Sequence, residues 1–556
     1  MSWKSYFSLF QRHETRPTPK CIYNKRIYWN AIIASWVAVI IGYDAGFIGG
    51  AVSLASFQRE FGLDTMSTHD KTNTTEIIIS LFQAGAFFGA LGTYPVAAKF
   101  GRKLSLAVAT VVLIVGSAIQ LASNSSSGLG AMYAGRVLTG VGIGTVSNVA
   151  PMYAAEIAPP SIRGQLIGFY EIAWQIGGVI GFWINYATSV HYSSDDNKQW
   201  MIPVGIQILP AGVLALVLWS LVESPRWLMS VGRREKALAN LCLLRKLPAD
   251  DEYLQYEFDI IEQEMAQKAR EVGTGIFDPV KGLLTSKSLM HRLGLSTSTF
   301  IIQNTVAVNA VNYYSPKIFQ AMGIDSVESS LLSTGVFGIL KGVFCLVWSV
   351  CIVDRFGRRP CLIFGLVLCS LCFWYIGAYI KVADPTARIS SGNSQIDGGG
   401  RAALALFYIW TIGYALSWSG TPWVWNAEVF PTSVRNASSA VNAASNWFWA
   451  FIIARFTNQM INAMDYGIFF FFASCMTVCL PIFYLLYPET KNIPMEYMDQ
   501  LFMHKPWRAH AIVMEQIKKD RMESDGLVET SITLDFKDSN EKRSETASTE
   551  IRPHQM

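Results

Sequence analysis

Charged residues are scarce in this chain of 556 residues. Lys, Arg, Asp and Glu make up 15% of the sequence, whereas a typical soluble protein has about 25%. Hydrophobic residues make up 51%. The net charge of +4 is small, and the basic residues stand in short clusters between apolar runs, so the sequence offers no basic face for nucleic acid. This composition is typical of a polytopic membrane protein, and we expect the lipid bilayer to surround it.

Sequence signals for catalysis, metal binding and secretion are also missing. The seven histidines are scattered, and the sequence holds no metal-ligand cluster, nucleotide-binding loop or nucleophile elbow. Most of the nine cysteines lie inside apolar stretches, where cysteine behaves as a small hydrophobic residue. The N-terminal stretch MSWKSYFSLFQRHETRPTPK lacks the apolar core of a cleaved signal peptide. We therefore expect no enzyme, no metal, no cofactor and no cleaved leader.

Apolar runs of about 20 residues, the length that crosses a bilayer as a helix, are abundant. Several contain Gly, Pro or a polar residue, which helices that line a pathway tolerate. The runs lie at 28–50, 77–98, 104–123, 129–150, 165–188, 200–222, 293–315, 328–350, 361–381, 402–426, 436–456 and 466–487. The predicted fold class is an all-α membrane protein with twelve transmembrane helices.

A hydrophilic segment at 223–292 divides the runs into six and six. We therefore predict five parts along the chain: an N-terminal segment at 1–26, a six-helix bundle at 27–222, a linker with short helices at 223–292, a second six-helix bundle at 293–487 and a tail at 488–556. The tail is polar and ends in SNEKRSETASTEIRPHQM, so we expect it to be largely disordered.

Basic residues concentrate in alternate connections between the runs. The positive-inside rule assigns those connections, the linker and both termini to the cytoplasm, and we expect a multi-pass protein of the plasma membrane. The opposite connections hold glycosylation sequons at Asn73 and Asn124, a pattern that also arises by chance. A third sequon, at Asn436, falls on the cytoplasmic side and should stay unmodified.

Three charged motifs occur twice, at matching places in the two sets of six runs. The pairs are Glu156-IAPPSI-Arg163 with Glu428-VFPTSV-Arg435, KFGRK with RFGRR, and ESPR with ETK. Matches in register indicate a duplicated six-helix unit. Two copies of this kind have parallel orientation and can rock about a central site, which gives alternating access.

The repeated charges all lie on the predicted cytoplasmic side. One interpretation is a latch, in which ion pairs between helices close the inner face while the outer face is open, because a charge near lipid is seldom left unpaired. The alternative is that each charge only anchors a helix end at the headgroups. The predicted latch residues are Arg102, Glu156, Arg163, Glu223, Arg226, Asp354, Arg358, Glu428, Arg435 and Glu489.

Together these motifs resemble those of the sugar porter family of the major facilitator superfamily, over about residues 25–500. The runs APPSIRG, EIAWQIGGVIGFWINYA and GTPWVWNAE are similar to the fungal quinate permease branch, whose relatives also include transporters of pentoses, fructose and sugar acids. One departure is Ala98, where the family has an acidic residue before KFGRK, whereas Asp354 keeps that acid in the second copy. The departure would weaken the latch of the first half or move it to Glu156 and Glu223.

The seventh run contains QNTVAVNAVNYYSP, which resembles the sugar-binding stretch of the family. Gln303 and Asn309 keep the family's places, while Asn304 and Ala307 replace a Gln and a Gly. Amide side chains suit a polyol because they offer both donors and acceptors to hydroxyl groups. The alternative for these amides is hydrogen bonding between helices.

Four further polar or aromatic positions are candidates for contact with the solute. The resemblance implies that Trp423 and Asn446 contact a sugar or close over it, although either could instead be packing. Glu171 stands where the family has a substrate-binding glutamine, so it could bind hydroxyl groups, take a proton or pair with a base. Lys341 could hold the carboxylate of an acidic solute, or could snorkel or pair with an acid.

Asp44 stands in the stretch GYDAGFIGG, which continues the first apolar run. A carboxylate in a membrane costs about 2.5–3.5 kcal/mol on insertion scales, so one that is present has a role. The resemblance implies that Asp44 is the proton site of a proton-coupled porter and that Arg136, in AGRVLTGVGIG, is its partner. The alternative is a permanent structural ion pair among close-packed glycines.

We therefore predict a secondary active transporter that takes up a monosaccharide, such as xylose, another pentose or a hexose, together with a proton. A proton-coupled quinate or sugar-acid permease is the alternative. A sensor that binds sugar without moving it is disfavoured, because the tail is short and poor in hydrophobic residues. The expected partners are a small polyhydroxylated solute, a proton and lipid, and we expect a monomer to suffice for function.

Overall fold

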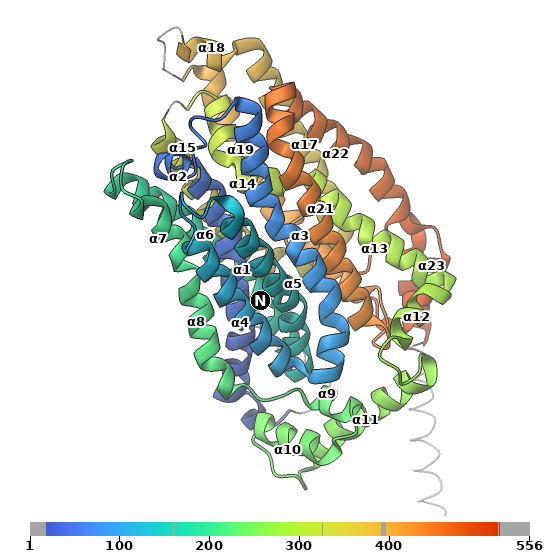
Figure 1. The fold of residues 1–556 in the computed structure, drawn as a ribbon. Coiled ribbons are helices and arrows are strands. Elements are labelled where there is room, and N and C mark those ends of the chain that lie inside the picture. Colours follow the sequence, from blue (N-terminus) through green and yellow to red (C-terminus); the bar gives the residue numbers. More distant parts are fainter. Residues whose placement is uncertain (1–17, 160–161, 325, 391–395, 521, 523–556) are drawn as a thin grey trace, which may run out of the picture.

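Long helices run from one end of the molecule to the other (Figure 1). The structure is a computed structural model that describes residues 18–159, 162–324, 326–390, 396–520 and 522, and those residues contain no β-strand. We call one end the linker end, because α9 (Pro225–Ser230), α10 (Arg234–Arg245) and α11 (Glu252–Glu271) lie there. The opposite end, with α2 (Ala55–Glu60) and α18 (Pro385–Ser390), is the far end.

Six crossings form the first half of the molecule. The first five are single helices, and the sixth is built from three consecutive pieces. They are α1 (Lys25–Ser53), α3 (Thr68–Phe100), α4 (Arg102–Leu121), α5 (Leu129–Ile157), α6 (Arg163–His191), and α7 (Lys198–Ile206) with α8 (Ile208–Val217) and η5 (Leu218–Ser220). Small and branched apolar side chains of α1, α3, α4, α5 and α8 share one buried cluster.

Six further crossings form the second half. Three of them are interrupted, and the interruptions lie at 306–307, 348–352 and 418–420. The crossings are α13 (Lys287–Thr305) with α14 (Val308–Ala321), α15 (Val327–Val347) with η6 (Trp348–Ile352) and α16 (Val353–Phe356), α17 (Arg358–Ala383), α19 (Gly398–Ser417) with α20 (Thr421–Glu428), α21 (Arg435–Met464) and α22 (Gly467–Leu486).

Each of the twelve predicted apolar runs coincides with one of these crossings. Eight segments of the described chain are long and apolar enough to cross a membrane by length and composition. The other four crossings, which are α5, α6, α13 with α14, and α21, are less apolar. They carry buried amide and hydroxyl side chains, such as Asn148, Asn304 and Asn442.

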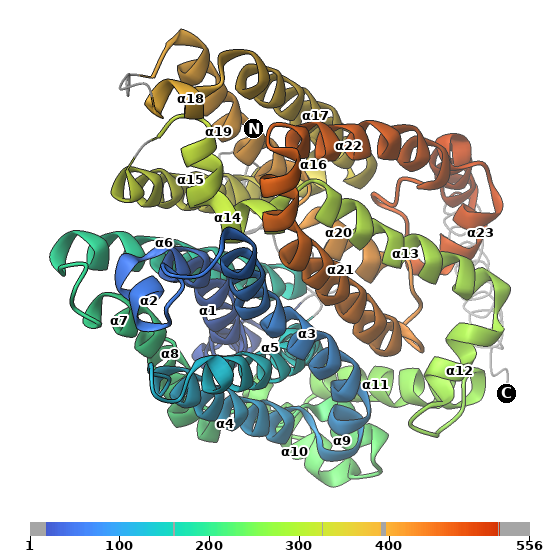
Figure 2. The same cartoon turned by 45° about the horizontal axis from the view of Figure 1, so that its top comes forward.

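The two halves lie side by side, with α3 packed against α21, α6 against α15, and α1 against α14 (Figure 2). Glycines in GYDAGFIGG make this packing of α1 possible. A Cβ atom on Gly42 would lie 1.9 Å from the Trp174 carbonyl oxygen of α6, and one on Gly49 would lie 2.1 Å from the Tyr313 carbonyl oxygen of α14. Any side chain at these two positions would push α1 away from its neighbours in both halves.

The linker and the first part of the tail are also helical. Trp227 of α9 belongs to a buried apolar cluster with α10 and α11, and its indole Nε1 donates to the Ala98 carbonyl oxygen at 2.8 Å. Beyond Pro488, η7 (Met495–Tyr497), α23 (Met498–Met503) and a helical stretch at 506–520 share a second cluster around Leu501 and Val513. The tail is therefore ordered in its first part. The prediction of disorder also covers 523–556, which lie outside the described residues.

Candidate functional site

Asp44 and Arg136 form an ion pair inside the first half. Arg136 Nη1 lies 2.7 Å from Asp44 Oδ1, and the exposed fractions of the two side chains are 0% and 4%. Arg136 is also held by α3, because its Nε donates to the Ile78 carbonyl oxygen at 3.1 Å and its Cζ lies 4.7 Å from the centre of the Phe82 ring. Among the described residues, Asp44 has no second hydrogen bond of this kind. If this carboxylate were neutralised, the ionic attraction between α1 and α5 at this point would be lost, while the contacts of Arg136 with α3 would remain.

One oxygen of Asp44 lacks a partner. Neither Asp44 Oδ2 nor Arg136 Nη2 has a hydrogen-bond partner among the described residues, although both atoms are buried. A small cavity beside Asp44 is lined in part by Ser117, Thr139 and Gln207, which are polar. Buried polar atoms are nearly always satisfied, so a carboxylate oxygen without a partner, on a residue that lines a cavity of mixed polar and apolar character, is a suitable place to receive a proton.

The amides of the seventh run gather at a break between α13 and α14. Asn309 Nδ2 donates to Asn304 Oδ1 at 2.5 Å across the break, and Gln303 Nε2 donates to the Trp418 carbonyl oxygen at 2.7 Å. Ala307 occupies the break with a φ of +74°. This left-handed conformation costs a non-glycine residue about 1–2 kcal/mol, so the break exists because the surrounding helices impose it.

Glu171 joins the two halves through one of its oxygens. Its Oε1 accepts from Gln175 Nε2 at 2.9 Å within α6, from Ser419 Oγ at 2.9 Å and from Cys345 Sγ at 3.2 Å. Ser419 and Cys345 belong to the second half. Glu171 Oε2 has no donor within hydrogen-bond distance among the described residues, and the side chain is partly exposed, so this oxygen is available to a solute.

Lys341 lies on α15, one helical turn before Cys345. Its side chain is buried, with an exposed fraction of 7%. Nζ donates to Asn312 Oδ1 at 3.1 Å and lies 5.6 Å from the centre of the Phe337 ring. Asn312 is the one acceptor that the described residues offer to this ammonium group, which carries three donors.

The remaining two predicted binding residues lie at the edge of this group. Asn446 of α21 is partly exposed and accepts from Asn304 Nδ2 at 3.4 Å. Trp423 of α20 has an exposed fraction of 37% and packs with its ring centre 4.6 Å from that of Phe300. Asn446 therefore belongs with the amides of the seventh run, whereas the ring contact described for Trp423 is with Phe300 of α13.

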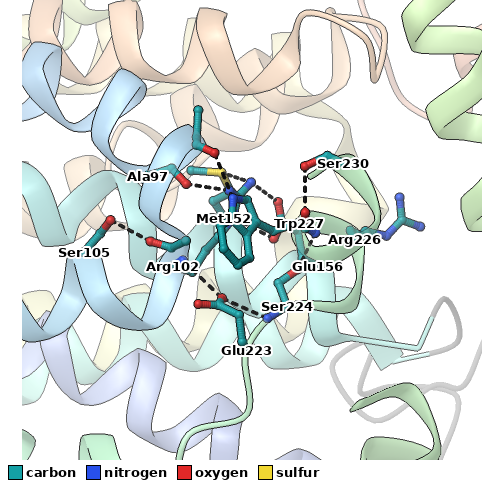
Figure 3. A network of polar contacts seen from close by, with 12 residues as sticks. Ala97, Arg102, Ser105, Met152, Glu156, Glu223, Ser224, Arg226, Trp227 and Ser230 are labelled. Atoms are coloured by element: carbon teal, nitrogen blue, oxygen red, sulfur yellow. Dashed lines mark hydrogen bonds and ion pairs between the residues drawn. The ribbon is translucent and has the colours of Figure 1, made fainter. Parts of the chain in front are cut away.

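At the linker end, one cluster of charges lies within the first half (Figure 3). Arg102 binds Glu156 in a two-point contact, with Nε to Oε2 at 2.9 Å and Nη2 to Oε1 at 2.6 Å. Glu223 accepts from the backbone N–H groups of Arg102 and Lys103, both at 3.1 Å, and so caps the first turn of α4. Burial raises the pKa of Glu223, and the backbone donors oppose that rise. The cluster ties α4 to α5 and to the start of the linker.

The second half carries the same arrangement. Arg358 Nη2 lies 2.6 Å from Glu428 Oε1. Glu489 accepts from the backbone N–H groups of Arg358 at 3.0 Å and Arg359 at 2.9 Å, and so caps α17. The residue before each capped helix is a glycine with positive φ, Gly101 at +93° and Gly357 at +89°. The internal repeat of the sequence is therefore also a repeat of geometry.

The other predicted latch residues have different surroundings. Arg226 pairs with Glu264 of the linker, and Arg435 Nη2 donates to the Phe430 carbonyl oxygen at 3.0 Å. The side chains of Arg163 and Asp354 lie outside the described residues. The ion pairs Arg102–Glu156 and Arg358–Glu428 each join parts of one half, and the pair Arg226–Glu264 lies within the linker.

A polar contact between the halves lies instead toward the far end, and the sequence interpretation missed it. Glu76 of α3, whose side chain is fully buried, pairs with Arg455 Nη1 of α21 at 2.6 Å. Gln459 of α21 donates to Glu76 twice, from its backbone N at 2.7 Å and from Nε2 at 2.8 Å. A carboxylate beside an apolar run is the signal that singled out Asp44, and the same test applied at the run edges would have found Glu76.

The two predicted glycosylation sites differ in their surroundings. Asn124 is exposed in the turn after α4, and its Oδ1 accepts from Ser127 N at 2.8 Å. Asn73 lies within α3, and its Oδ1 accepts from Arg455 Nη2 at 2.6 Å. Asn73 therefore belongs to the contact between the halves.

The chain is similar to known transport proteins over most of its length. The family described as "Sugar (and other) transporter" matches residues 30–502. The chain is 46% identical to a "Probable quinate permease" of Aspergillus niger over 92% of this chain and 95% of that protein, and 47% identical to one of Aspergillus terreus over 92% and 94%.

Solved structures share the fold. A structure of the proton:xylose symporter XylE bound to 6-bromo-6-deoxy-D-glucose aligns with a TM-score of 0.69 at 22% identity, over 86% of this chain and 99% of that one. An inward open structure of XylE from E. coli aligns with a TM-score of 0.67 at 21% identity, over 85% and 99%. The twelve-helix major facilitator fold predicted from the sequence is confirmed by these likenesses.

Proposed function

Because this chain belongs to the sugar transporter family, we propose that it moves a small polyhydroxylated solute across a membrane together with a proton, by alternating access of its two halves. The observation that carries the proposal is the buried Asp44–Arg136 pair with its unpartnered carboxylate oxygen. A buried carboxylate in a membrane protein is expensive and is commonly functional.

Asp44 is the proton site in this proposal. Protonation removes the negative charge that balances Arg136, so the bond between α1 and α5 weakens. The contacts of Arg136 with Ile78 and Phe82 still hold its side chain against α3. Since α1 packs on α14 through Gly49 and Tyr313, a shift of α1 is transmitted to the helix that carries Asn309 and Asn312. Proton binding and solute binding are thereby coupled through one pair of helices.

The solute binds between the halves, at the amides of the seventh run together with Glu171, Asn446 and Trp423. Asn309 and Asn446 are partly exposed, and amides and a carboxylate oxygen offer the donors and acceptors that neighbouring hydroxyl groups need. A monosaccharide such as xylose, another pentose or a hexose fits this chemistry. Quinate or a sugar acid is the second candidate, which the names of the 46–47% identical relatives favour.

The linker end faces the cytoplasm in this proposal, and the membrane is the plasma membrane. The repeated basic motifs KFGRK and RFGRR both lie at the linker end, which agrees with the positive-inside rule. The far end then faces outward, and the halves are joined there by Glu76 and Arg455. This arrangement corresponds to a conformation that is closed to the outside, in which the linker-end clusters hold each half rigid. The protein works as a monomer.

Uptake in a transport-deficient fungal cell tests the proposal. The full chain should accumulate labelled xylose or quinate above the external concentration, with external alkalinisation, and a protonophore should abolish the accumulation. Asp44→Asn should lose uphill accumulation and keep exchange of solute across the membrane, because exchange needs no net proton movement.

Glu76→Gln is the matched control, since Glu76 is also a buried acid that is paired with an arginine. Uptake by the Glu76→Gln variant should still be abolished by the protonophore, whether or not its uptake rate changes. If Asp44→Asn accumulates solute as well as the parent chain does, Asp44 is not the coupling site. If no polyhydroxylated solute is moved by the parent chain, the transport proposal itself is wrong.

A further inference from the structure

Lys341 and Glu171 are opposite charges on different halves, set into the same group of polar side chains. Cys345 connects them. It stands one helical turn after Lys341 on α15, and its Sγ donates a hydrogen bond to Glu171 Oε1 at 3.2 Å. Residues four apart share one face of a helix. A buried cation and a partly exposed acid therefore face the same space between α6 and α15.

From this arrangement we propose that Lys341 binds the carboxylate of an acidic polyol, and that Glu171 serves as its counter-charge only while the solute is absent. The inference rests on the proposed transport function and narrows its substrate to a polyhydroxylated monocarboxylate, of which quinate is the probe. The Lys341 ammonium is the specificity-determining group, and the amides of the seventh run bind the hydroxyl groups.

The hydrogen bonds of Lys341 support this role. Its Nζ has three donors and a single acceptor among the described residues, Asn312 Oδ1 at 3.1 Å. A buried ammonium with unused donors is costly unless an anion balances it. No hydrogen bond joins Lys341 to Glu171 in the described chain, so the lysine is balanced at a distance and keeps donors for another carboxylate.

The hydrogen bonds of Glu171 point the same way. The three donors that the described residues supply to Glu171 all contact Oε1, and two of them, Ser419 and Cys345, come from the second half. These neutral donors hold the carboxylate in place without the lysine. The carboxylate of an arriving solute can therefore pair with the Lys341 ammonium while Glu171 keeps its own hydrogen bonds. The negative charge of Glu171 then repels a second anion.

Paired uptake measurements test the inference in the full chain. Quinate and its neutral methyl ester have the same ring and hydroxyl groups and differ in charge. Lys341→Gln should lower kcat/KM for quinate by at least about tenfold, the effect of losing a charged hydrogen bond, and should leave uptake of the ester within about threefold. Glu171→Gln should lower KM for quinate, because the ammonium then has no competing acid.

Lys317→Gln is the matched control. Lys317 is a half-buried lysine on α14 whose Nζ also donates to an asparagine oxygen, Asn458 Oδ1 at 2.7 Å, but it stands near the contact between α3 and α21. It should change uptake of quinate and of the ester by the same factor. Surface abundance of each variant, measured by labelling from outside, separates poor folding from altered binding.

Several outcomes would overturn the inference while leaving the transport proposal intact. One is a parent chain that carries xylose with a proton and does not carry quinate. Another is a Lys341→Gln variant that carries quinate normally. A third is equal loss of quinate and ester in both single variants with recovery in the Lys341→Gln, Glu171→Gln double variant, which is the behaviour of a structural ion pair. A parent chain that carries no solute with a proton refutes the transport proposal instead.

Discussion

The two ends of this molecule use charge in opposite ways. At the linker end, the ion pairs Arg102–Glu156 and Arg358–Glu428 each lie inside one half. Toward the far end, Glu76 and Arg455 join one half to the other. An ion pair inside a half moves with it as a rigid body, whereas a pair between the halves must break when they rock apart. The first kind stabilises the fold, and the second kind stabilises one conformation.

The difference also explains why the far-end contact has so many donors. Glu76 is fully buried and accepts hydrogen bonds from Arg455, from the Gln459 backbone N–H and from the Gln459 side-chain amide. A second contact nearby joins Asn462 of α21 to Thr72 of α3 at 2.6 Å. A fully buried charge needs several partners, since each one offsets part of the cost of removing it from water.

The largest effect is expected from Arg455→Ala, which leaves the buried Glu76 without its cation. We expect this to remove about 3 kcal/mol of the free energy that favours the present conformation, with a smaller effect on thermal unfolding. The measurement is the rate at which a membrane-impermeant thiol reagent labels Asn309→Cys from outside, which should rise when the far-end contact is weakened.

A double-mutant cycle of Glu76→Gln and Arg455→Ala sharpens this prediction. The effects of the two changes should be non-additive by about 1–3 kcal/mol, because the residues share one contact. Additive effects would mean that Glu76 and Arg455 do not hold the halves together, and the contrast between the two ends would then fail.

A smaller effect on conformation and a clear effect on stability are expected at the linker end. Arg102→Ala and Arg358→Ala should each lower the free energy of unfolding by about 2–3 kcal/mol, because each leaves a largely buried glutamate unpaired. Together they should be additive within about 0.5 kcal/mol, since the two clusters lie in different halves and share no partner. Thermal unfolding in detergent is the measurement. Strong coupling between them would show that the clusters meet across the halves.

The next smaller effect on stability is expected from changes to the caps of α4 and α17. Glu223→Gln and Glu489→Gln each replace one of the two cap oxygens by an amide nitrogen that cannot accept from a backbone N–H. Each should cost about 1 kcal/mol of stability, and the two losses should be alike because Gly101 and Gly357 present the caps with the same geometry. Unequal losses of stability would show that the two copies of the motif do not contribute equally to folding.

The linker-end clusters were predictable from sequence because they occur twice. Glu156 and Glu428 stand at matching distances from Arg163 and Arg435, and repetition separates a functional charge from a chance one. The crossings were predictable for a similar reason, since long apolar runs have few alternatives in a membrane protein. The interruptions of the crossings were not predictable. The sequence of the seventh run is consistent with one continuous helix, and the packing of neighbouring helices forces Ala307 into the left-handed region.

The far-end contact was harder to predict for a physical reason. Glu76 and Arg455 are 379 residues apart, neither belongs to a repeated motif, and each could have been a charge that simply marks a helix end at the membrane surface. The pairing of Lys341 with Asn312 was hidden in the same way, because a sequence shows that a buried charge needs a partner without showing which helix supplies it. Packing between the halves decides these partners.

The smallest effect on stability, and the simplest test of the far end, concerns the two sequons. If the far end faces outward and its contact forms as described, Asn124 should carry the glycan, because it is exposed in a turn, and Asn73 should not, because a glycan there would lie between α3 and α21. Asn124→Gln should abolish the mobility shift caused by an endoglycosidase and change thermal unfolding little. Asn73→Gln should leave the shift intact. A glycan found on Asn73 would be incompatible with its bond to Arg455 and would remove the main support for a far end that joins the halves.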